Sequence, residues 1–205
     1  MADLDLFLRS TAVVDWRSNA VTEQARALAA GRRDPTAIAR SCFEWVRDRI
    51  PHTVDAGLDA VACTASETLS LGTGFCYAKS HLLAALLRAN GIPAGLGYQR
   101  LASDDRGERH CLHGFAFVWL PAIGWYAVDA RGNRADLPRA SFEPPVPRLV
   151  FDARGAGERT FAGVWAEPVR PVVEALRRAR TREELLRDLP DAIDLGVPPV
   201  VRSSV

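Results

Sequence analysis

The chain has 205 residues, 48% of them hydrophobic, and its 26 basic and 25 acidic residues leave a formal net charge of +1. This length supports one substantial core, and the small net charge gives no field that favours nucleic acid or an anionic membrane. The N-terminus lacks the basic start and apolar run of a signal peptide, and the four cysteines are too few for a disulfide scaffold. We therefore expect a soluble, cytoplasmic protein with reduced thiols.

The N-terminal part of the chain is predicted to be helical. Apolar residues recur on one helical stripe within the first 30 residues, and Gly31 ends this helix. A second helix is expected to start at Asp34-Pro35 and to run to Pro51, because aspartate is a favoured N-cap and proline fits the first helical position.

The stretch TASETLSLGTGFCYAKSHLLAALLRANG contains two further predicted helices. It begins with Thr64–Glu67, which has the spacing of a capping box, so a short helix should follow. The glycines of GTG end that helix and turn the chain. The next helix is expected to start at Cys76 and to stop at Asn90-Gly91.

Beyond this helix the hydrophobic period changes to two, which indicates strands. Strands are predicted at residues 96–101, 113–120 and 125–130. A three-residue loop at 121–123 would pair residue 115 with 129 and residue 113 with 131. His113 and Asp129 would then be diagonal neighbours in a hairpin.

The last part of the chain is proline-rich and then helical, with helices expected near residues 168–180 and 181–189. Their arginines alternate with acidic residues, which is typical of a solvated helix face rather than of a nucleic-acid contact. We expect residues 1–140 to form the main domain and residues 141–205 to form a helical C-terminal extension packed on it.

Cys76 is the candidate nucleophile. A cysteine in the first turn of a helix lies at the positive end of the helix dipole, which favours the thiolate. The glycines before it let the backbone approach a bound carbonyl closely, and the Cys76 amide can face the oxyanion that forms.

A thiolate also needs a base, and four histidines are available. His81 lies on the same helix as Cys76 at an unfavourable angle, and His110 lies in a loop, so both are interpreted as surface or structural histidines. His113 opens a strand that can lie beside the helix. Asp129 closes an apolar strand, where a carboxylate needs a partner, and it can orient the imidazole.

Three sequence blocks, in this order, resemble the transglutaminase-like superfamily: ASETLSLGTGFCYAKSHLLAALLRANGIPAG, HGFAFVWL and GWYAVDA. The upstream stretch DPTAIARSCFEWVRDRIPH resembles the helix that precedes the cysteine block in its small bacterial members, which are described as candidate cysteine proteases. The resemblance implies an α+β, papain-like core in which a nucleophile helix packs on an antiparallel β-sheet. It also implies Cys76 as nucleophile, His113 as general base and then acid, and Asp129 as the orienting residue.

Two positions depart from the family pattern. The histidine is usually followed by a small residue, a tryptophan and an acidic position, whereas this chain has HGFAF. The aspartate is usually followed by a proline or a threonine pair, whereas Ala130-Arg131 follows here. Both changes lie in the neighbourhood where substrate is expected to bind.

These residues predict acyl chemistry on a peptide, protein or small amide substrate through a thioester at Cys76, with hydrolysis as the expected outcome and no cofactor. Acyl transfer from a protein glutamine, as in a transglutaminase, is one alternative. A non-catalytic binding member of the fold is another, although no member of the Cys-His-Asp set is missing.

His110, Cys111 and His113 are close in sequence and are candidate zinc ligands. Without a Cys-x-x-Cys pair or a helical His-x-x-x-His to complete four ligands, no metal is expected.

The second oxyanion donor is predicted to be His52. It follows the helix that contains Trp45, at a position where small family members carry an aromatic donor. The alternative is that His52 ends a helix in solvent. Gln99 is the next candidate for the donor.

Overall fold

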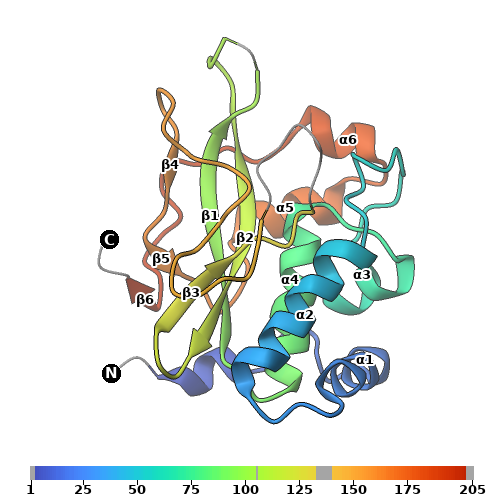
Figure 1. The fold of residues 1–205 in the computed structure, drawn as a ribbon. Coiled ribbons are helices and arrows are strands. Elements are labelled where there is room, and N and C mark those ends of the chain that lie inside the picture. Colours follow the sequence, from blue (N-terminus) through green and yellow to red (C-terminus); the bar gives the residue numbers. More distant parts are fainter. Residues whose placement is uncertain (1–2, 105, 133–139, 202–205) are drawn as a thin grey trace.

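The computed structural model describes residues 3–104, 106–132 and 140–201, and it has a sheet covered on one side by helices (Figure 1). The helices are η1 (Leu4–Leu8, 3-10), α1 (Asn19–Ala29), α2 (Pro35–Arg49), α3 (Ala65–Leu71), α4 (Cys76–Ala89), α5 (Arg170–Arg178) and α6 (Arg182–Arg187). The strands are β1 (Ala94–Ala102), β2 (His110–Leu120), β3 (Gly124–Val128), β4 (Arg159–Thr160), β5 (Gly163–Val164) and β6 (Val200–Val201).

The main sheet is antiparallel, with the strand order β3-β2-β1-β4. Strands β2 and β3 pair Ala116 with Val128 and Leu120 with Gly124, so the loop between them holds three residues. This is the predicted register, in which paired residue numbers share one parity. The expected α+β class, with a helix packed on an antiparallel sheet, is confirmed.

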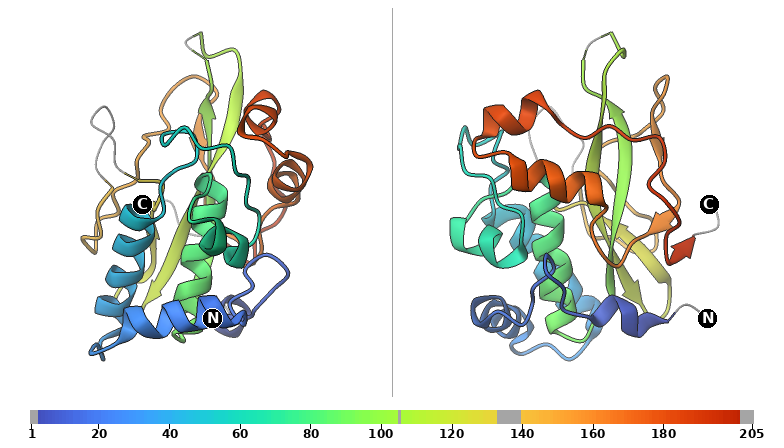
Figure 2. Two further views of the ribbon diagram at one scale, coloured as in Figure 1. Left: turned by 90° about the vertical axis from the view of Figure 1, so that its right-hand side faces the viewer. Right: turned by 180° about the vertical axis from the view of Figure 1, so that it is seen from behind.

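Helix α4 is the centre of the fold. All of its residues from Cys76 to Arg88 are buried, because α1, α2 and α3 pack around it and β1 and β2 lie against it (Figure 2). A helix that is enclosed on all sides is held in place by its whole surface. The packing therefore fixes the position of the first turn of α4 and of any functional group on it.

The predicted caps of α2 and α3 are confirmed. Asp34 accepts hydrogen bonds from the backbone N–H groups of Thr36 and Ala37 at the start of α2. Thr64 and Glu67 form the capping box of α3, each accepting from the other's backbone N–H. These helix starts are set by hydrogen bonds between residues two or three positions apart, which is why local sequence predicts them.

The prediction of a continuous helix over the first 30 residues is wrong. Only η1 and α1 are helical there, and residues 9–18 form an irregular segment of bends with one turn. The hydroxyl oxygen of Thr11 accepts from the N–H groups of Val13 and Val14, which gives the backbone a local alternative to a helix.

The C-terminal extension is also less helical than expected. Residues 141–169 contain the short strands β4 and β5, and β4 pairs with β1 at the edge of the main sheet. The prolines of this segment carry no N–H and cannot continue a helix. Helices α5 and α6 follow, and both lie on the same side of the sheet as α4 (Figure 2).

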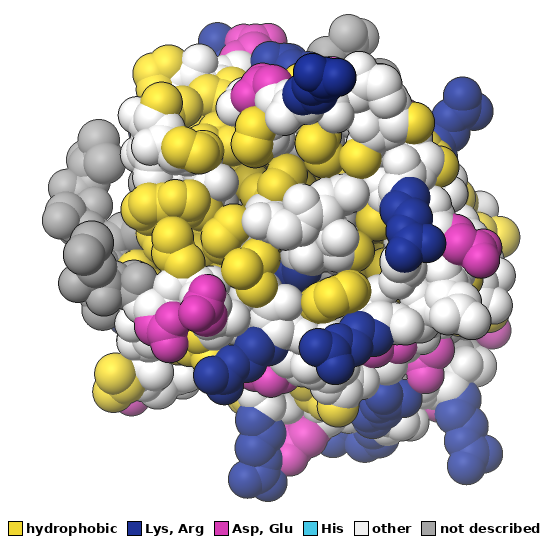
Figure 3. Space-filling view, turned by 90° about the horizontal axis from the view of Figure 1, so that it is seen from below, with side chains coloured by type: hydrophobic (Ala, Val, Ile, Leu, Met, Phe, Trp, Pro, Cys, Tyr) yellow, Lys and Arg dark blue, Asp and Glu magenta, His cyan; other side chains and the backbone are white. Residues whose placement is uncertain are grey.

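Hydrophobic side chains are not confined to the core. Seen from below, they gather on one part of the surface, and charged side chains are scattered around this part (Figure 3). The turn between β2 and β3, where Ile123 is 41% exposed, lies at this end of the molecule. Within the described ranges, no helix has both the length and the apolarity needed to cross a membrane.

Candidate active site

Cys76 is the first residue of α4, and its side chain is only 3% exposed. Helix α3 ends at Gly72, whose φ of 64° is the left-handed conformation that glycine adopts without strain. A Cβ atom on Gly74 would lie 3.0 Å from Thr68 Cγ2. The two glycines thus allow α3 and the start of α4 to pack closely, and this packing places Cys76.

His113 lies on β2, which is held against the first turns of α4. Ser80 Oγ donates to the carbonyl of Gly114 at 3.2 Å, and the hydroxyl of Tyr77 donates to the carbonyl of Leu112. A Cβ atom on Gly114 would lie 2.8 Å from Tyr77 Cδ1, so the helix could not approach β2 this closely with any other residue there. The contact therefore sets the spacing between Cys76 and His113.

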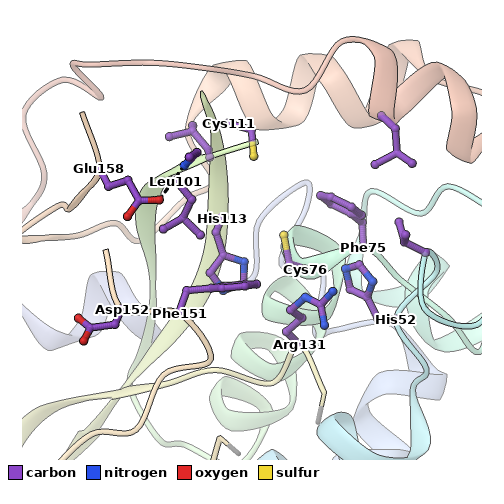
Figure 4. Close-up of a pocket in the computed structure, with 14 residues that line it drawn as sticks. His52, Phe75, Cys76, Leu101, Cys111, His113, Arg131, Phe151, Asp152 and Glu158 are labelled. Carbon is purple, nitrogen blue, oxygen red and sulfur yellow. Dashed lines mark hydrogen bonds between the residues drawn. The ribbon is translucent and has the colours of Figure 1, made fainter. Parts of the chain in front are cut away.

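The structure brings Cys76, His113 and Asp129 together, as expected. His113 Nε2 donates to Asp129 Oδ2 at 2.8 Å, which leaves Nδ1 for the hydrogen bond with Cys76. Figure 4 shows the sulfur of Cys76 beside the imidazole ring of His113. Asp129 is fully buried and also accepts from the N–H groups of Arg131 at 3.0 Å and Val150 at 3.1 Å.

The charges of these groups support one another. Burial lowers the pKa of His113, but the Asp129 carboxylate, the Cys76 sulfur and hydrogen bonds with both outweigh it and raise this pKa to about 10. Burial raises the pKa of Asp129, but the charge and hydrogen bond of His113 and two backbone N–H groups outweigh it, so its pKa is lowered. The arrangement favours an imidazolium between the carboxylate and the sulfur.

The other three cysteines have surroundings that disfavour the thiolate. Burial raises the pKa of Cys42 to about 12 and that of Cys111 to about 12, and it also raises the pKa of Cys63. A nucleophile needs the thiolate form. These three thiols are therefore poorly suited to attack a carbonyl at neutral pH.

A cavity of about 320 Å³ opens over Cys76. One part of its wall is apolar and is formed by Val54, Phe75, Leu101, Leu112, Phe151 and Leu186. His52, His113 and Arg131 line the part nearer the sulfur, as Figure 4 shows. The cavity can hold a side chain of a substrate while its reacting carbonyl lies at Cys76.

His52 lines this cavity and is only 5% exposed, so the alternative that it ends a helix in solvent is wrong. A parallel bridge joins it to Gly74, with hydrogen bonds from Thr53 N to Gly74 O and from Gly74 N to Pro51 O. Burial, followed by the charge of Arg131, lowers the pKa of His52 to about 3. The ring is therefore neutral at neutral pH.

Gln99 is placed differently. It is opposite His113 in the β1–β2 register, but it does not line the cavity. Its Nε2 donates to Phe151 O at 3.1 Å and to Thr160 Oγ1 at 2.9 Å. Both amide hydrogens are thus already donated to the segment around β4.

The remaining histidines make structural contacts. His81 is buried, its Nδ1 is 2.8 Å from the carbonyl of Cys63, and burial lowers its pKa to about 4. His110 Nε2 is 3.0 Å from the carbonyl of Ala156. Among the residues that the structure describes, no three His, Cys, Asp or Glu side chains are grouped to hold a metal ion.

Several residues of the site were not predicted. Arg131 lines the cavity and forms a bidentate salt bridge with Asp55, with N···O distances of 2.8 and 3.1 Å. Phe151 packs edge-on against the ring of His113, with ring centroids 4.9 Å apart. In the sequence, Arg131 stands out only as part of a departure from the family pattern, and Phe151 lies outside the motifs.

Comparison with known proteins identifies the family of this fold and site. The family model of the transglutaminase-like superfamily matches residues 22–130, which is more than half of the chain and includes Cys76, His113 and Asp129. The chain belongs to this superfamily. The recognition made from the three sequence blocks is confirmed.

Solved structures match this chain at low sequence identity. A candidate cysteine protease of Cytophaga hutchinsonii matches with a TM-score of 0.52 and 17% identity, over 64% of this chain and 43% of that chain. Red sea bream transglutaminase matches with a TM-score of 0.45 and 14% identity, over 57% of this chain and 27% of the other. The periplasmic domain of TgpA from Pseudomonas aeruginosa matches with a TM-score of 0.45 and 20% identity, over 60% and 45%.

The matched region spans less than half the length of each of these three proteins. The first match therefore shows a shared fold and does not transfer an activity. The comparison with curated proteins found no match.

Proposed function

We propose that this superfamily member is a thiol hydrolase that cleaves peptide or related amide bonds through a thioester at Cys76. The observation that supports the proposal is the contact of His113 with both Cys76 and the buried Asp129 at the floor of an open cavity. A nucleophile, a base and an orienting carboxylate in this order are the parts that acyl transfer through a thiol requires.

The reaction follows from the positions of these groups. The Cys76 thiolate attacks the amide carbonyl, and the His113 imidazolium gives its proton to the leaving amine as the C–N bond breaks. The acyl group is then a thioester on Cys76. Water attacks this thioester, neutral His113 takes the proton of the water, and the carboxylic acid leaves as the thiolate is restored.

The negative oxygen that forms in each step needs hydrogen-bond donors. The backbone N–H of Cys76 is one, because the first N–H groups of a helix have no partner within the helix. We assign the second to His52, which lines the cavity and is neutral at neutral pH. A neutral imidazole that carries its proton on the nitrogen facing the cavity can donate without a change of charge.

The nucleophile is tested by alkylation of the native protein with iodoacetamide at neutral pH, followed by mapping of the modified cysteine. We expect Cys76 to react first and Cys76→Ser to abolish the rapid phase. Cys111→Ser is the matched control, since Cys111 lines the same cavity. Faster reaction at Cys42, Cys63 or Cys111 would overturn the assignment.

The reaction type is tested with a peptide library analysed by mass spectrometry, with and without an added primary amine. Hydrolysis predicts new carboxyl termini that require Cys76 and that the amine does not suppress. Products that contain the amine instead of water would identify acyl transfer. Dialysis against a chelator should leave the activity unchanged, because the proposed steps use no metal.

A further inference from the structure

Arg131 is a charged side chain that lines the cavity beside the proposed reaction centre. The backbone N–H of Arg131 donates to Asp129 Oδ1 at 3.0 Å, and this hydrogen bond fixes the Arg131 backbone relative to the orienting carboxylate. Its guanidinium lies over the ring of Phe151, 5.7 Å from the ring centroid. Figure 4 shows it between the sulfur of Cys76 and the ring of His52.

Only part of the hydrogen-bonding capacity of Arg131 is used. Its two terminal nitrogens each donate to one oxygen of Asp55, at 2.8 and 3.1 Å. A guanidinium has five N–H groups, and its side edge, formed by Nε and one terminal nitrogen, is a second fork of the kind that binds a carboxylate through two hydrogen bonds. Nε makes no hydrogen bond to any described residue, and it is not one of the buried atoms without a partner, so this edge of the guanidinium reaches solvent. Arg131 lines the cavity over Cys76, where a substrate would meet it.

The acidic side chains that line the same cavity have other partners. Glu158 accepts from the N–H groups of Ala102 at 2.9 Å and Gly155 at 2.7 Å. Asp152 pairs with Arg154 at 2.9 Å on the exposed rim. His52 is neutral, and the imidazolium of His113 is already held between the Asp129 carboxylate and the Cys76 sulfur. Among the described residues on this part of the wall, the guanidinium of Arg131 is the further cation that can attract an anion.

We propose that Arg131 recognises a carboxylate of the substrate, so that the preferred substrates are peptides or amides with a free carboxylate close to the scissile bond. This inference rests on the proposed function, because Cys76 supplies the chemistry. The pairing with Asp55 reduces the long-range field of Arg131, so that recognition depends on the geometry of the open fork. Substrates cleaved at an internal peptide bond have uncharged amides next to that bond, so they offer Arg131 no carboxylate to bind.

The test compares two alkylating agents of similar size at Cys76: iodoacetate, which carries a carboxylate, and iodoacetamide, which is neutral. The quantity compared is the rate with iodoacetate divided by the rate with iodoacetamide. Arg131→Gln should lower this ratio about tenfold, the loss expected for a charge-assisted hydrogen bond. Asp55→Asn should raise the same ratio, because it removes the negative charge that neutralises Arg131. Arg148→Gln, at an exposed position, is the matched control and should leave the ratio unchanged.

The opposite signs separate recognition from damage to the fold. A disturbed pocket would lower both rates together, whereas loss of a carboxylate site changes their ratio. The double variant Arg131→Gln, Asp55→Asn removes both charges, and it should show the low ratio of Arg131→Gln. Arg131→Lys keeps the charge without the fork, and its ratio should lie between those of wild type and Arg131→Gln.

A pair of substrates completes the test. For a peptide cleaved by the enzyme, the free acid next to the scissile bond should have a KM about tenfold below that of its carboxamide, and Arg131→Gln should remove this difference with little change in kcat. Equal ratios of the two alkylation rates in wild type and Arg131→Gln would overturn the inference while leaving the nucleophile in place. Failure of Cys76 to react with either reagent would overturn the proposed function and this inference with it.

Discussion

Replacing Asp129 by asparagine separates the charge of this residue from its shape. Oδ2 accepts two hydrogen bonds, from His113 and Val150, while Oδ1 accepts one, from Arg131 N. The asparagine amide should therefore turn its oxygen toward His113 and Val150 and its NH2 toward the N–H of Arg131. The asparagine NH2 and the N–H of Arg131 then face each other in a fully buried site, two donors with no acceptor between them.

The size of each effect follows from that geometry. One unsatisfied buried donor costs about 1–3 kcal/mol of unfolding free energy, whereas Asp129→Ala leaves three donors unsatisfied and should cost about 3 kcal/mol or more. In Asp129→Asn the imidazole keeps its orientation, but its hydrogen bond loses the assistance of a charge, which predicts a rate about tenfold lower. In Asp129→Ala the ring is no longer oriented, and a loss of about a hundredfold or more is expected.

The assay measures urea unfolding together with the pH dependence of Cys76 alkylation and of turnover. Asp129 raises the pKa of His113, so its neutralisation should lower this pKa and move the alkaline limit of turnover to lower pH. Equal losses of rate in Asp129→Asn and Asp129→Ala, or an alkaline limit that does not move, would refute the reasoning.

Three further predictions concern the oxyanion, the packing and the pH dependence. His52→Phe should retain alkylation of Cys76 but lower turnover about a hundredfold, as the loss of one oxyanion donor does. Gly114→Ala should lower the unfolding free energy by about 1–3 kcal/mol, because its Cβ would lie 2.8 Å from Tyr77 Cδ1. His113, with its pKa raised from 6.5 to about 10, adds stability that is complete below pH 6.5 and lost as the pH rises toward 10. Burial lowers the pKa of Lys79 from 10.5 to about 7, so the contribution of Lys79 to the free energy of unfolding rises with pH above 7. His113→Gln removes the opposite contribution of His113, so the free energy of unfolding should increase more with pH in this variant than in the wild type.

Each of these predictions has a contrary outcome. Unchanged turnover in His52→Phe would assign the second donor to another group. Full stability and activity in Gly114→Ala would mean that α4 can shift without affecting the site. The same pH slope in wild type and His113→Gln, measured by urea unfolding between pH 6.5 and 10, would contradict the raised pKa of His113.

The parts of the fold that sequence predicted well depend on near neighbours. The caps at Asp34 and Thr64 are decided within one helical turn, and the β2–β3 register follows from the parity of a three-residue loop. Strand β4 has two residues and pairs with β1 about 60 positions earlier in the chain, so no periodic pattern marks it. The turn at residues 9–18 depends on the hydroxyl of Thr11, which competes with a helix that the apolar pattern alone would allow.

The same distinction applies to the site. Cys76 starts a helix, and Asp129 directly follows the second strand of a hairpin, so their meeting with His113 could be inferred. The sequence placed His113 at the start of the first strand, whereas β2 begins three residues earlier, at His110. The pairing of Arg131 with Asp55 spans 76 positions and belongs to two loops, which carry no periodic signal. Prediction of that pair needs the folded arrangement of the loops.

The hydrogen bond from Val150 to Asp129 means that the segment needed to hold the site extends beyond the residues matched by the family model. The family match ends at residue 130, yet the Asp129 carboxylate also accepts a hydrogen bond from the backbone N–H of Val150, 21 positions later in the chain. A fragment cut at the end of the family match would keep every motif residue and lose part of their support. Engineering of this protein, by truncation, domain exchange or fusion, therefore has to carry the segment around Val150 along with the motifs.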